Sequence, residues 1–276
     1  MAPIPPLRHC TAVGYGGAQV EGRNKASLVE CVVTIRDPAT GAWEATGERK
    51  ELLVKFPGVA HMTPATAGRD VLGGALARSF GLDCPESLAV TVSDGFVAAT
   101  AAEFGARGVR IAAGVAAGAV YIPGMTPLSP KQDLSLAELS AGAAILAFDM
   151  LVQNPDRRRT NPNCAKLGER VMAFDHDLAF SFLEPFLLGR PSQAWAVSEF
   201  GPMVQDHFFY QALRRKSELC RAVLDKLADL TRDDFADLMA TMPAEWSDEA
   251  ARVIDHVLTV AEHKDEFYTE LGRALA

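Results

Sequence analysis

Hydrophobic positions in the first half of the chain come in short runs that turn residues separate. Residues 27–35 are rich in Val, Ile and Thr, and a second run at 50–56 ends at Pro57 and Gly58. Runs of this length, bounded by Gly, Pro and Asp, are typical of β-strands. Similar runs occur at residues 11–13, 88–92 and 119–122, and a glycine-rich turn is predicted at 14–17. We therefore predict a small antiparallel sheet in this part of the chain.

Two helices are predicted among these strands. Residues 66–80 place Val71, Leu72 and Leu76 on one face, and Gly81 follows the last of these turns. This spacing is typical of an amphipathic helix, and the glycine is expected to end it. A second, short helix is predicted over residues 97–106, within a stretch rich in Ala and Gly.

Beyond Lys131 the pattern becomes helical almost throughout. Ser135 and Glu138 have the spacing of a capping box, in which the serine and glutamate side chains satisfy two backbone amides at the start of a helix. The helix that they open is apolar on all sides to about residue 152, which indicates a buried helix. Further helices are predicted at residues 204–230, 233–241 and 249–275, with Ser247 as the N-cap of the last one.

Together these patterns predict an α+β protein with two lobes. We expect residues 1–123 to form a small β-rich amino lobe with one main helix. Residues 124–134 are rich in Pro and form the predicted linker or hinge. Residues 135–276 are expected to form the larger, mostly helical carboxy lobe.

Composition narrows the possible environments and partners. The chain has 35 acidic and 27 basic residues, so its formal net charge is −8. An acidic protein is a poor non-specific ligand of nucleic acid, although a local basic patch could hold a small phosphate compound. The most apolar stretch, residues 141–152, contains Asp149 and is too short to cross a bilayer. The proline-rich amino terminus lacks the apolar core of a signal peptide, and the five cysteines form no CxxC pair. We expect a cytoplasmic protein that binds neither a membrane nor, by itself, nucleic acid.

Three oxygen-bearing side chains follow the predicted buried helix. Asp156 and Asn161 are five residues apart on a polar loop, and Asp175 comes directly after the apolar run at 171–174. In phosphoryl transfer, one carboxylate orients the attacking hydroxyl, while an amide oxygen and a second carboxylate hold the magnesium ions. A D-x4-N loop followed by a strand that ends in Asp supplies these three groups. Each residue alone is also ordinary turn or strand-end chemistry, so the assignment rests on their combination.

The upstream half offers a matching amine. Lys55 lies near the end of the 50–56 run, between Val54 and Phe56, so its stem is expected to pack while its amine faces a cleft. A lysine on such a strand contacts phosphates in kinase-like sites. Asp70, near the start of the next helix, is the candidate acidic partner of Lys55. The alternative interpretations are an edge-strand lysine that prevents aggregation and an aspartate that complements the helix dipole.

These motifs resemble those of the HipA-like kinases. The resemblance rests on Lys55, on the helix that ends near Leu82, on Asn154-x-Asp-Arg-x3-Asn161, and on Phe174-Asp-His-Asp-Leu-Ala-Phe180. It covers most of the chain, from about residue 52 to the terminal helices, and is greatest for the short, stand-alone bacterial members. Two positions depart from the common pattern: Arg158 stands where many relatives have histidine, and Asp70 stands in place of glutamate.

The resemblance implies a bilobal protein-kinase-like fold that binds ATP and Mg²⁺ and transfers phosphate to protein Ser or Thr hydroxyls. Asp156 is then the catalytic base, and Asn161 and Asp175 are the metal ligands. Lys55 is the phosphate-binding lysine, with Asp70 as its partner. A protein substrate and an antitoxin-type partner are also implied.

Other candidate positions rest on weaker patterns. Gly16 and Gly17 belong to a glycine-rich stretch whose amides could cover phosphates, but the stretch matches no nucleotide-binding fingerprint and a plain β-turn explains it better. Tyr121 and Met125, where the predicted lobes join, are candidates for the adenine edge. The basic residues at 157–159 could neutralise charge or dock a substrate, or form a solvated face. His176 could order its loop through hydrogen bonds.

Two further functions remain open from the sequence. One is a nucleotide-binding or partner-binding module with weak or no catalysis, because Asp70 is short and no clear glycine-rich fingerprint is present. The other is a small-molecule or lipid kinase, since such enzymes use a similar D-x4-N…D arrangement.

Overall fold

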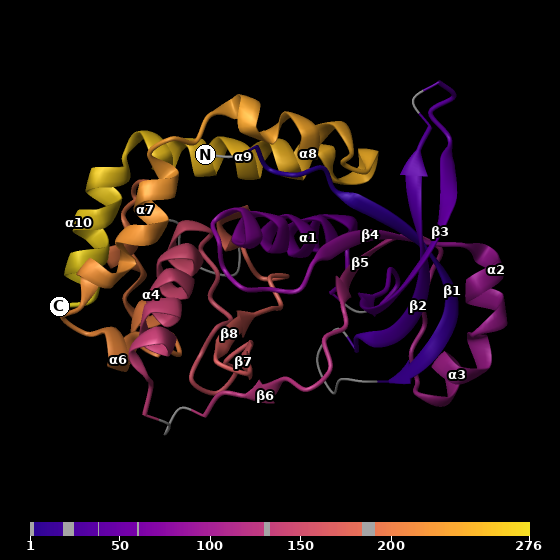
Figure 1. Ribbon diagram of the computed structural model, residues 1–276, viewed down its shortest axis with the longest axis horizontal. Coiled ribbons are helices and arrows are strands. Elements are labelled where there is room, and N and C mark those ends of the chain that lie inside the picture. Colours follow the sequence, from indigo (N-terminus) through magenta and orange to yellow (C-terminus); the bar gives the residue numbers. More distant parts are fainter. Residues whose placement is uncertain (1–2, 19–24, 38, 60, 130–132, 184–190) are drawn as a thin grey trace.

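A computed structural model describes residues 3–18, 25–37, 39–59, 61–129, 133–183 and 191–276. Figure 1 shows a β-rich amino-terminal part on the right and a helical carboxy-terminal part on the left. Five strands close into a barrel in the order β1-β2-β3-β5-β4. Their bounds are β1 Arg8–Ala18, β2 Ser27–Arg36, β3 Trp43–Lys55, β4 Ser87–Val92 and β5 Gly114–Val120.

The barrel differs from the predicted antiparallel sheet in how it closes. Four of its strand pairs are antiparallel, but β1 and β4 are parallel and join the two edges of the sheet. Closure removes the exposed edges that an open sheet of this size would present. Strand β3 also begins at Trp43, well before the predicted start at residue 50, because its polar first half pairs with β2 outside the buried core.

Small residues explain two errors of the sequence-based prediction within the barrel. The 14–17 stretch is not a turn but part of β1, whose register with β2 shifts between Ala12 and Gly14 and again between Tyr15 and Gly17. Strand β5 begins at Gly114 within the Ala and Gly stretch and ends before Tyr121. A side chain at Gly118 would lie 2.5 Å from Val90 Cγ2, so the narrow barrel interior selects residues that the sequence pattern does not mark as strand formers.

Helix α1, Pro64–Ser79, lies between the barrel and the helical part (Figure 1). Thr63 caps it by accepting a hydrogen bond from Thr66 N at 3.1 Å. Glycines let α1 approach its neighbours closely. A Cβ atom at Gly68 would lie 3.1 Å from Trp246, and one at Gly73 would lie 2.6 Å from His176 Cβ. The helix is therefore held between two elements of the carboxy-terminal part.

The predicted helix at 97–106 is two short helices, α2 Asp94–Ala99 and α3 Ala101–Ala106. Thr100 interrupts them, and its hydroxyl donates to Phe96 O at 2.8 Å. Both helices lie on the outer side of the barrel (Figure 1).

The predicted linker is partly described. Thr126–Pro127 forms a short strand, β6, while residues 130–132 lie outside the described residues. Strand β6 pairs with β7, Cys164–Leu167, which pairs with β8, Arg170–Ala173, in a second antiparallel sheet. This sheet therefore links the connection between the two parts to the segment that precedes Asp175.

The buried helix of the sequence prediction is α4, Leu136–Leu151, and both hydrogen bonds of its capping box are present. Ser135 N donates to Glu138 Oε2 at 2.7 Å, and Glu138 N donates to Ser135 Oγ at 3.3 Å. The last residues of α4 are fully buried, so this helix is the centre of the carboxy-terminal core.

The later helices are shorter than predicted. The 204–230 region breaks into α5 Gly201–Asp206, α6 Tyr210–Leu213, the 3-10 turn η3 Ser217–Cys220, and α7 Arg221–Leu227. His207 leaves the helical conformation because the backbone there pairs with Arg158. The rest consists of η1 Ser181–Leu183, η2 Val197–Phe200, η4 Arg232–Phe235, α8 Ala236–Ala240 and η5 Ala244–Trp246.

The predicted terminal helix is also divided, into α9 Ser247–Glu262 and α10 Lys264–Ala274. The break is at His263, whose ring stacks on Trp195 with 3.6 Å between ring centroids. Ser247 is not the N-cap. It is the first helical residue, and its hydroxyl donates to Pro243 O at 3.2 Å because the 3-10 turn η5 leads directly into α9.

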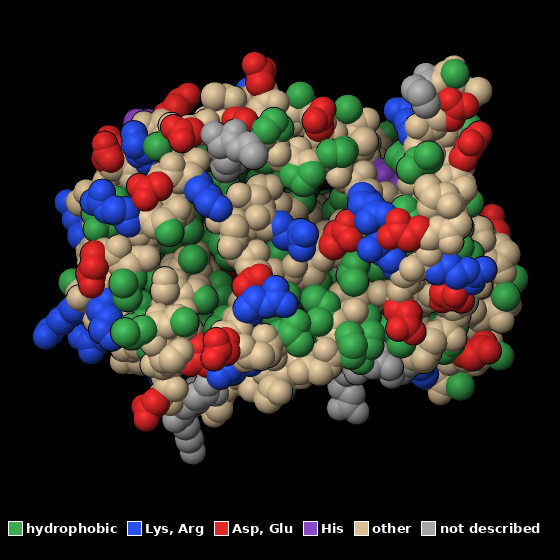
Figure 2. Space-filling view, in the orientation of Figure 1, with side chains coloured by type: hydrophobic (Ala, Val, Ile, Leu, Met, Phe, Trp, Pro, Cys, Tyr) green, Lys and Arg blue, Asp and Glu red, His purple; other side chains and the backbone are tan. Residues whose placement is uncertain are grey.

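The distribution of surface charge and the lengths of the helices bear on the environment of the protein. Acidic and basic side chains are interspersed over the face shown in Figure 2. Within the part of the chain that the structure describes, no helix has the length and apolar character needed to span a bilayer.

Candidate active site

Lys55, at the end of β3, lies among three carboxylates, and we call these four residues the Lys55 cluster. Its Nζ atom is 2.6 Å from Asp175 Oδ1, 2.9 Å from Asp70 Oδ2 and 3.1 Å from Asp177 Oδ2. The strand supplies the amine, α1 supplies Asp70, and the segment after β8 supplies the other two carboxylates. Three segments far apart in the sequence therefore meet at one amine.

The backbone around Asp175 is held in an uncommon conformation. Asp175 has a φ of 60°, in the left-handed region that residues with a Cβ atom seldom occupy. His176 N, the next amide, donates to Asp70 Oδ1 at 2.9 Å, so Asp70 contacts both Lys55 and this backbone. Strained backbone of this kind concentrates at functional sites and persists only when its surroundings fix it.

The charges of the cluster perturb one another. Burial opposes the charged form of Lys55, but Asp175, Asp70 and Asp177 outweigh it and raise the pKa of this amine. Burial also opposes ionisation of Asp175, yet Lys55 lowers the pKa of this carboxyl. Asp177 behaves differently, because burial and the neighbouring carboxylates raise its pKa to about 7 despite Lys55.

Asp156 lies on the loop that follows α4, which we call the 154–163 loop. Its Oδ2 accepts hydrogen bonds from Asn161 Nδ2 at 2.8 Å and from Asn163 Nδ2 at 3.0 Å. Its Oδ1 accepts one from Arg158 Nη2 at 2.9 Å. Its own backbone N–H donates to Asn154 Oδ1 at 3.1 Å, which forms a tight local turn. The structure thus brings Asp156 and Asn161 into direct contact.

Asn163 connects this loop to the segment that bears Asp175. Its side chain donates to Asp156, while its carbonyl oxygen accepts from Phe174 N at 3.0 Å. With a φ of 44°, Asn163 is itself in the left-handed region, which asparagine tolerates better than most residues. The two carboxylates predicted for chemistry, Asp156 and Asp175, are therefore linked through two intervening residues.

Beneath the loop lies a second, closed group of polar side chains, the Asp149 cluster: Asp149, Asn154, Arg157 and His207. Arg157 Nε donates to Asp149 Oδ2 at 2.5 Å, and His207 Nε2 lies 3.0 Å from the same oxygen. The Arg157 guanidinium also donates to the carbonyl oxygens of Asn163 and Phe174. Arg157 is thus buried and is not part of a solvated face, because its partners lie inside the molecule.

The other two arginines of this stretch are exposed. Arg158 bonds to Asp156, whereas Arg159 pairs with Asp206 Oδ1 at 3.4 Å. The three consecutive arginines therefore have three different environments. His176 does order its loop, through its backbone N–H, and burial lowers the pKa of its ring to about 4.

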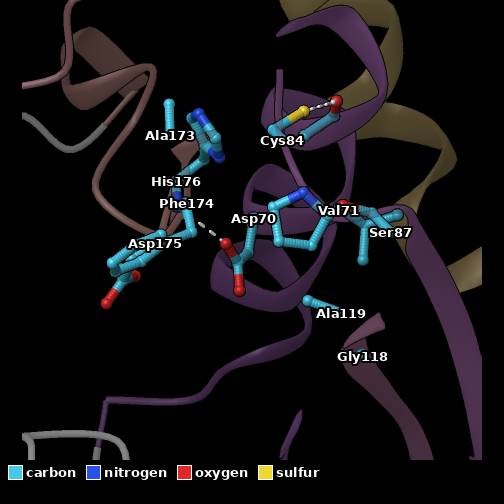
Figure 3. Close-up of a pocket in the computed structure, with 12 residues that line it drawn as sticks. Asp70, Val71, Cys84, Ser87, Gly118, Ala119, Ala173, Phe174, Asp175 and His176 are labelled. Atoms are coloured by element: carbon cyan, nitrogen blue, oxygen red, sulfur yellow. Dashed lines mark hydrogen bonds between the residues drawn. The ribbon is translucent and has the colours of Figure 1, made fainter. Parts of the chain in front are cut away.

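A small pocket opens beside Asp70. Figure 3 shows Asp70 facing the backbone of His176, with Ser87, Gly118 and Ala119 on the other side. Asp70 and Asp175 line this pocket, together with residues of α1, β4, β5 and the segment after β8. Tyr121 and Met125 are not among its lining residues, and neither are Gly16 and Gly17.

Among the described contacts, none connects the following predicted site residues to the Lys55 cluster or to the 154–163 loop: Gly16, Gly17, Tyr121 and Met125. Tyr121 N donates to Glu51 O at 2.8 Å just after β5, and Gly17 pairs with Leu28 at the end of β1. The adjoining residues 19–24 lie outside the described part of the chain.

Sequence reasoning missed four polar residues of the site: Asn163, Asp177, Asp149 and His207. Asp149 had a usable signal, because a lone carboxylate in an otherwise apolar buried helix requires a partner. Asp177 lies two residues after Asp175 and could have been paired with it. No local pattern indicated His207, which comes from a distant segment.

Comparison with known proteins defines the class. The family model described as "HipA-like kinase" matches residues 35–273. The match covers most of the chain, and the chain therefore belongs to the HipA-like kinase family. This membership supports an activity of the kinase type, a phosphotransferase.

Comparisons with curated proteins and with solved structures do not narrow the function further. No curated protein matches the sequence. Among solved structures, the chain is similar to "Crystal structure of A Helicobacter pylori proinflammatory kinase CtkA", with 13% identity, 98% of each chain covered and a TM-score of 0.47. A similarity at this level does not define the fold or the function of the chain.

Proposed function

We propose that the protein is an ATP- and Mg²⁺-dependent kinase that phosphorylates Ser or Thr hydroxyls of a protein. In this proposal the fold is bilobal and protein-kinase-like, with lobes at residues 1–123 and 135–276 joined at 124–134. The single observation that supports it best is the connected set of side chains from Asp156 through Asn163 and Phe174 to Asp175 and Lys55.

The donor set fits Mg²⁺. Asn161 uses its amide nitrogen on Asp156, so its carbonyl oxygen is the atom left for a ligand. Asp175 has a side chain that is 34% exposed, beside the buried amine of Lys55. Within the described residues no group of three or more His, Cys, Asp and Glu side chains is arranged to hold a metal. Mg²⁺ in kinases needs only one or two carboxylates, because waters and phosphates complete its shell. When bound, the ion neutralises charge on the phosphates.

In the proposed phosphoryl transfer, each of these side chains has a separate role. Asp156 orients the acceptor hydroxyl and receives its proton, and the amides of Asn161 and Asn163 fix the carboxylate for this task. Lys55 holds the non-transferred phosphates, and Asp70 keeps the amine in place. Asn161 and Asp175 are the proposed metal ligands. A cytoplasmic location and an antitoxin-type partner remain part of the proposal through the family.

One observation favours a nucleotide-binding module with little catalysis. Within the described residues, the hydrogen bonds to the Asp156 carboxylate come from its own loop, and one of them is from the Arg158 guanidinium to Oδ1. The acceptor hydroxyl then has to share Oδ1 with the Arg158 guanidinium. Calorimetric titration with Mg-ATP separates the two functions: binding without turnover over a long incubation supports the module.

The test of the kinase proposal is direct. Purified protein with radiolabelled ATP and Mg²⁺ is expected to label itself or an added protein, and mass spectrometry then gives the modified residue. Asp156→Ala should lower the rate by about 10²–10⁴-fold. Asp255→Ala is a matched control, because Asp255 is exposed and pairs with Arg232 away from the site. Equal labelling by wild type and Asp156→Ala would refute the role of Asp156.

A further inference from the structure

The segment after α5 pairs with the 154–163 loop through its backbone. Phe208 N donates to Arg157 O at 3.0 Å, and Arg159 N donates to Asp206 O at 3.1 Å. Between these bonds, Arg158 and His207 form an antiparallel bridge. The chain leaves the helical conformation at His207 to make these contacts, so the helix that the sequence pattern predicts through this point is broken there.

The side chain of His207 continues the connection into the core. Phe209 N donates to His207 Nδ1 at 3.3 Å, so Nδ1 is the acceptor and Nε2 has the proton. Nε2 then donates to Asp149 Oδ2 at 3.0 Å. The histidine side chain is 1% exposed, so bulk solvent does not reach this hydrogen bond.

Asp149 connects His207 to the loop, because it also accepts hydrogen bonds from Asn154 and Arg157. Its Oδ1 accepts from Asn154 Nδ2 at 3.1 Å, and Asn154 Oδ1 in turn accepts from Asp156 N. Its Oδ2 accepts from Arg157 Nε, while the same guanidinium donates to Phe174 O, just before Asp175. Removing the donor at His207 therefore disturbs a carboxylate on which the placement of Asp156 depends.

We propose that His207 is a positioning residue for phosphoryl transfer: through Asp149 it fixes the 154–163 loop and with it the direction of the Asp156 carboxylate. This role rests on the proposed function, because it concerns the rate of that reaction. His207 does not touch the reacting groups. The proposed nucleotide contacts of Lys55 and Asp175 come from other segments, whereas the proposed metal ligand Asn161 lies on the loop. We therefore expect the rate of transfer to fall more than the affinity for Mg-ATP.

Three variants isolate the hydrogen bond. His207→Phe keeps an aromatic ring and removes the donor. His207→Gln retains an N–H near the position of Nε2. His256→Phe is the matched control, since His256 is also buried and contacts Leu151 O of α4 at 2.8 Å but does not contact the loop. All three are compared with wild type at a temperature where each is folded by circular dichroism.

Two measurements are made on each variant: steady-state kinetics with Mg-ATP, and hydrogen–deuterium exchange of loop peptides. His207→Phe is expected to lower kcat by about 10²-fold with a smaller change in KM for ATP, because small misplacements of a catalytic group have effects of this size. Its loop amides should exchange faster than those of wild type. His207→Gln should recover most of both properties, and His256→Phe should change neither.

The proposal is overturned if loop exchange in His207→Phe equals that of wild type, or if its kcat falls no further than that of His256→Phe. Failure of the proposed function gives a different result. If wild type transfers no phosphate, the exchange measurement still decides the loop contact: faster exchange only in His207→Phe supports positioning, and unchanged exchange contradicts it.

Discussion

The Lys55 cluster and the Asp149 cluster differ in their balance of positive and negative charge. The Lys55 cluster contains one amine and three carboxylates, and it is partly open to solvent at Asp175. The Asp149 cluster contains one carboxylate, one guanidinium, a neutral imidazole and the Asn154 amide, and all four residues are at most 2% exposed.

This difference distinguishes a site that accepts a ligand from one that holds the fold. In the Asp149 cluster both carboxylate oxygens have protein donors, so nothing further is needed to satisfy it. The Lys55 cluster has an excess of negative charge around one cation, and its most accessible carboxylate faces solvent. A cation added there would be stabilised, whereas a charge removed from the closed cluster would leave a buried ion unpaired.

The largest expected effect is on the closed cluster. Arg157→Met should lower the free energy of unfolding by about 3–5 kcal/mol, because it leaves the Asp149 carboxylate buried without its partner. Chemical denaturation measures this loss. Replacing both partners, with Asp149→Leu added, should restore part of it. A Lys55→Met variant that loses as much stability as Arg157→Met would contradict the distinction between the clusters.

The second effect is on the open cluster and concerns ligand binding. Wild type with Mg-ATP at about 100 times its Kd should gain roughly 2.7 kcal/mol in the free energy of unfolding. Asp175→Asn should lose most of this gain, while its stability without ligand falls by less than that of Arg157→Met because Asp70 and Asp177 still pair with Lys55. Thermal melts with and without Mg-ATP measure both quantities. If Mg-ATP protects the variant as much as wild type, Asp175 is not a ligand of the nucleotide complex.

The third and smallest effect is a pH dependence. Burial raises the pKa of Asp149, but Arg157 and His207 outweigh it and lower the pKa to about 2 from 3.8. A lowered pKa means that the stabilisation is complete above the ordinary pKa and is lost as the pH falls towards 2. The stability difference between wild type and Asp149→Asn should therefore shrink by about 2 kcal/mol between neutral pH and pH 2.

For Asp177, the contribution to stability is expected to change with pH in the opposite direction to that of Asp149. Its raised pKa of about 7 means that its contribution to stability is largest below its ordinary value of 3.8 and is lost as the pH rises through 7. Denaturation of Asp177→Asn without nucleotide should show a weaker alkaline decline than wild type. A difference from wild type that does not change with pH would show that the two clusters do not differ in this way.

Local sequence signals predicted those elements of the fold that depend on neighbours along the chain. The capping box at Ser135 and Glu138 was confirmed, as was the helix before Gly81, because both depend on contacts within one turn. The long helices after residue 200 were wrong. There, contacts with distant residues, such as the bridge between His207 and Arg158, outweigh helical periodicity.

In the candidate site, too, local sequence signals were informative and contacts between distant segments were not predicted. Residue types and spacing marked Lys55, Asp70, Asp156, Asn161 and Asp175, and the structure brings them into two connected groups. The contribution of Asp177 to the Lys55 cluster depends on the left-handed turn at Asp175, which redirects the chain. His207 reaches Asp149 across 58 residues of sequence, a separation over which no periodic pattern gives information.

Two glycines in the wall of the pocket beside Asp70 let neighbouring elements approach each other closely. A Cβ atom at Gly118 would lie 2.5 Å from Val90 Cγ2, and one at Gly74 would collide with Ser87. A larger residue at either place would push β5 or α1 away from its neighbour. Asp70 lies about one turn before Gly74 on α1, so the position of its carboxylate beside Lys55 depends on how closely this helix approaches β4.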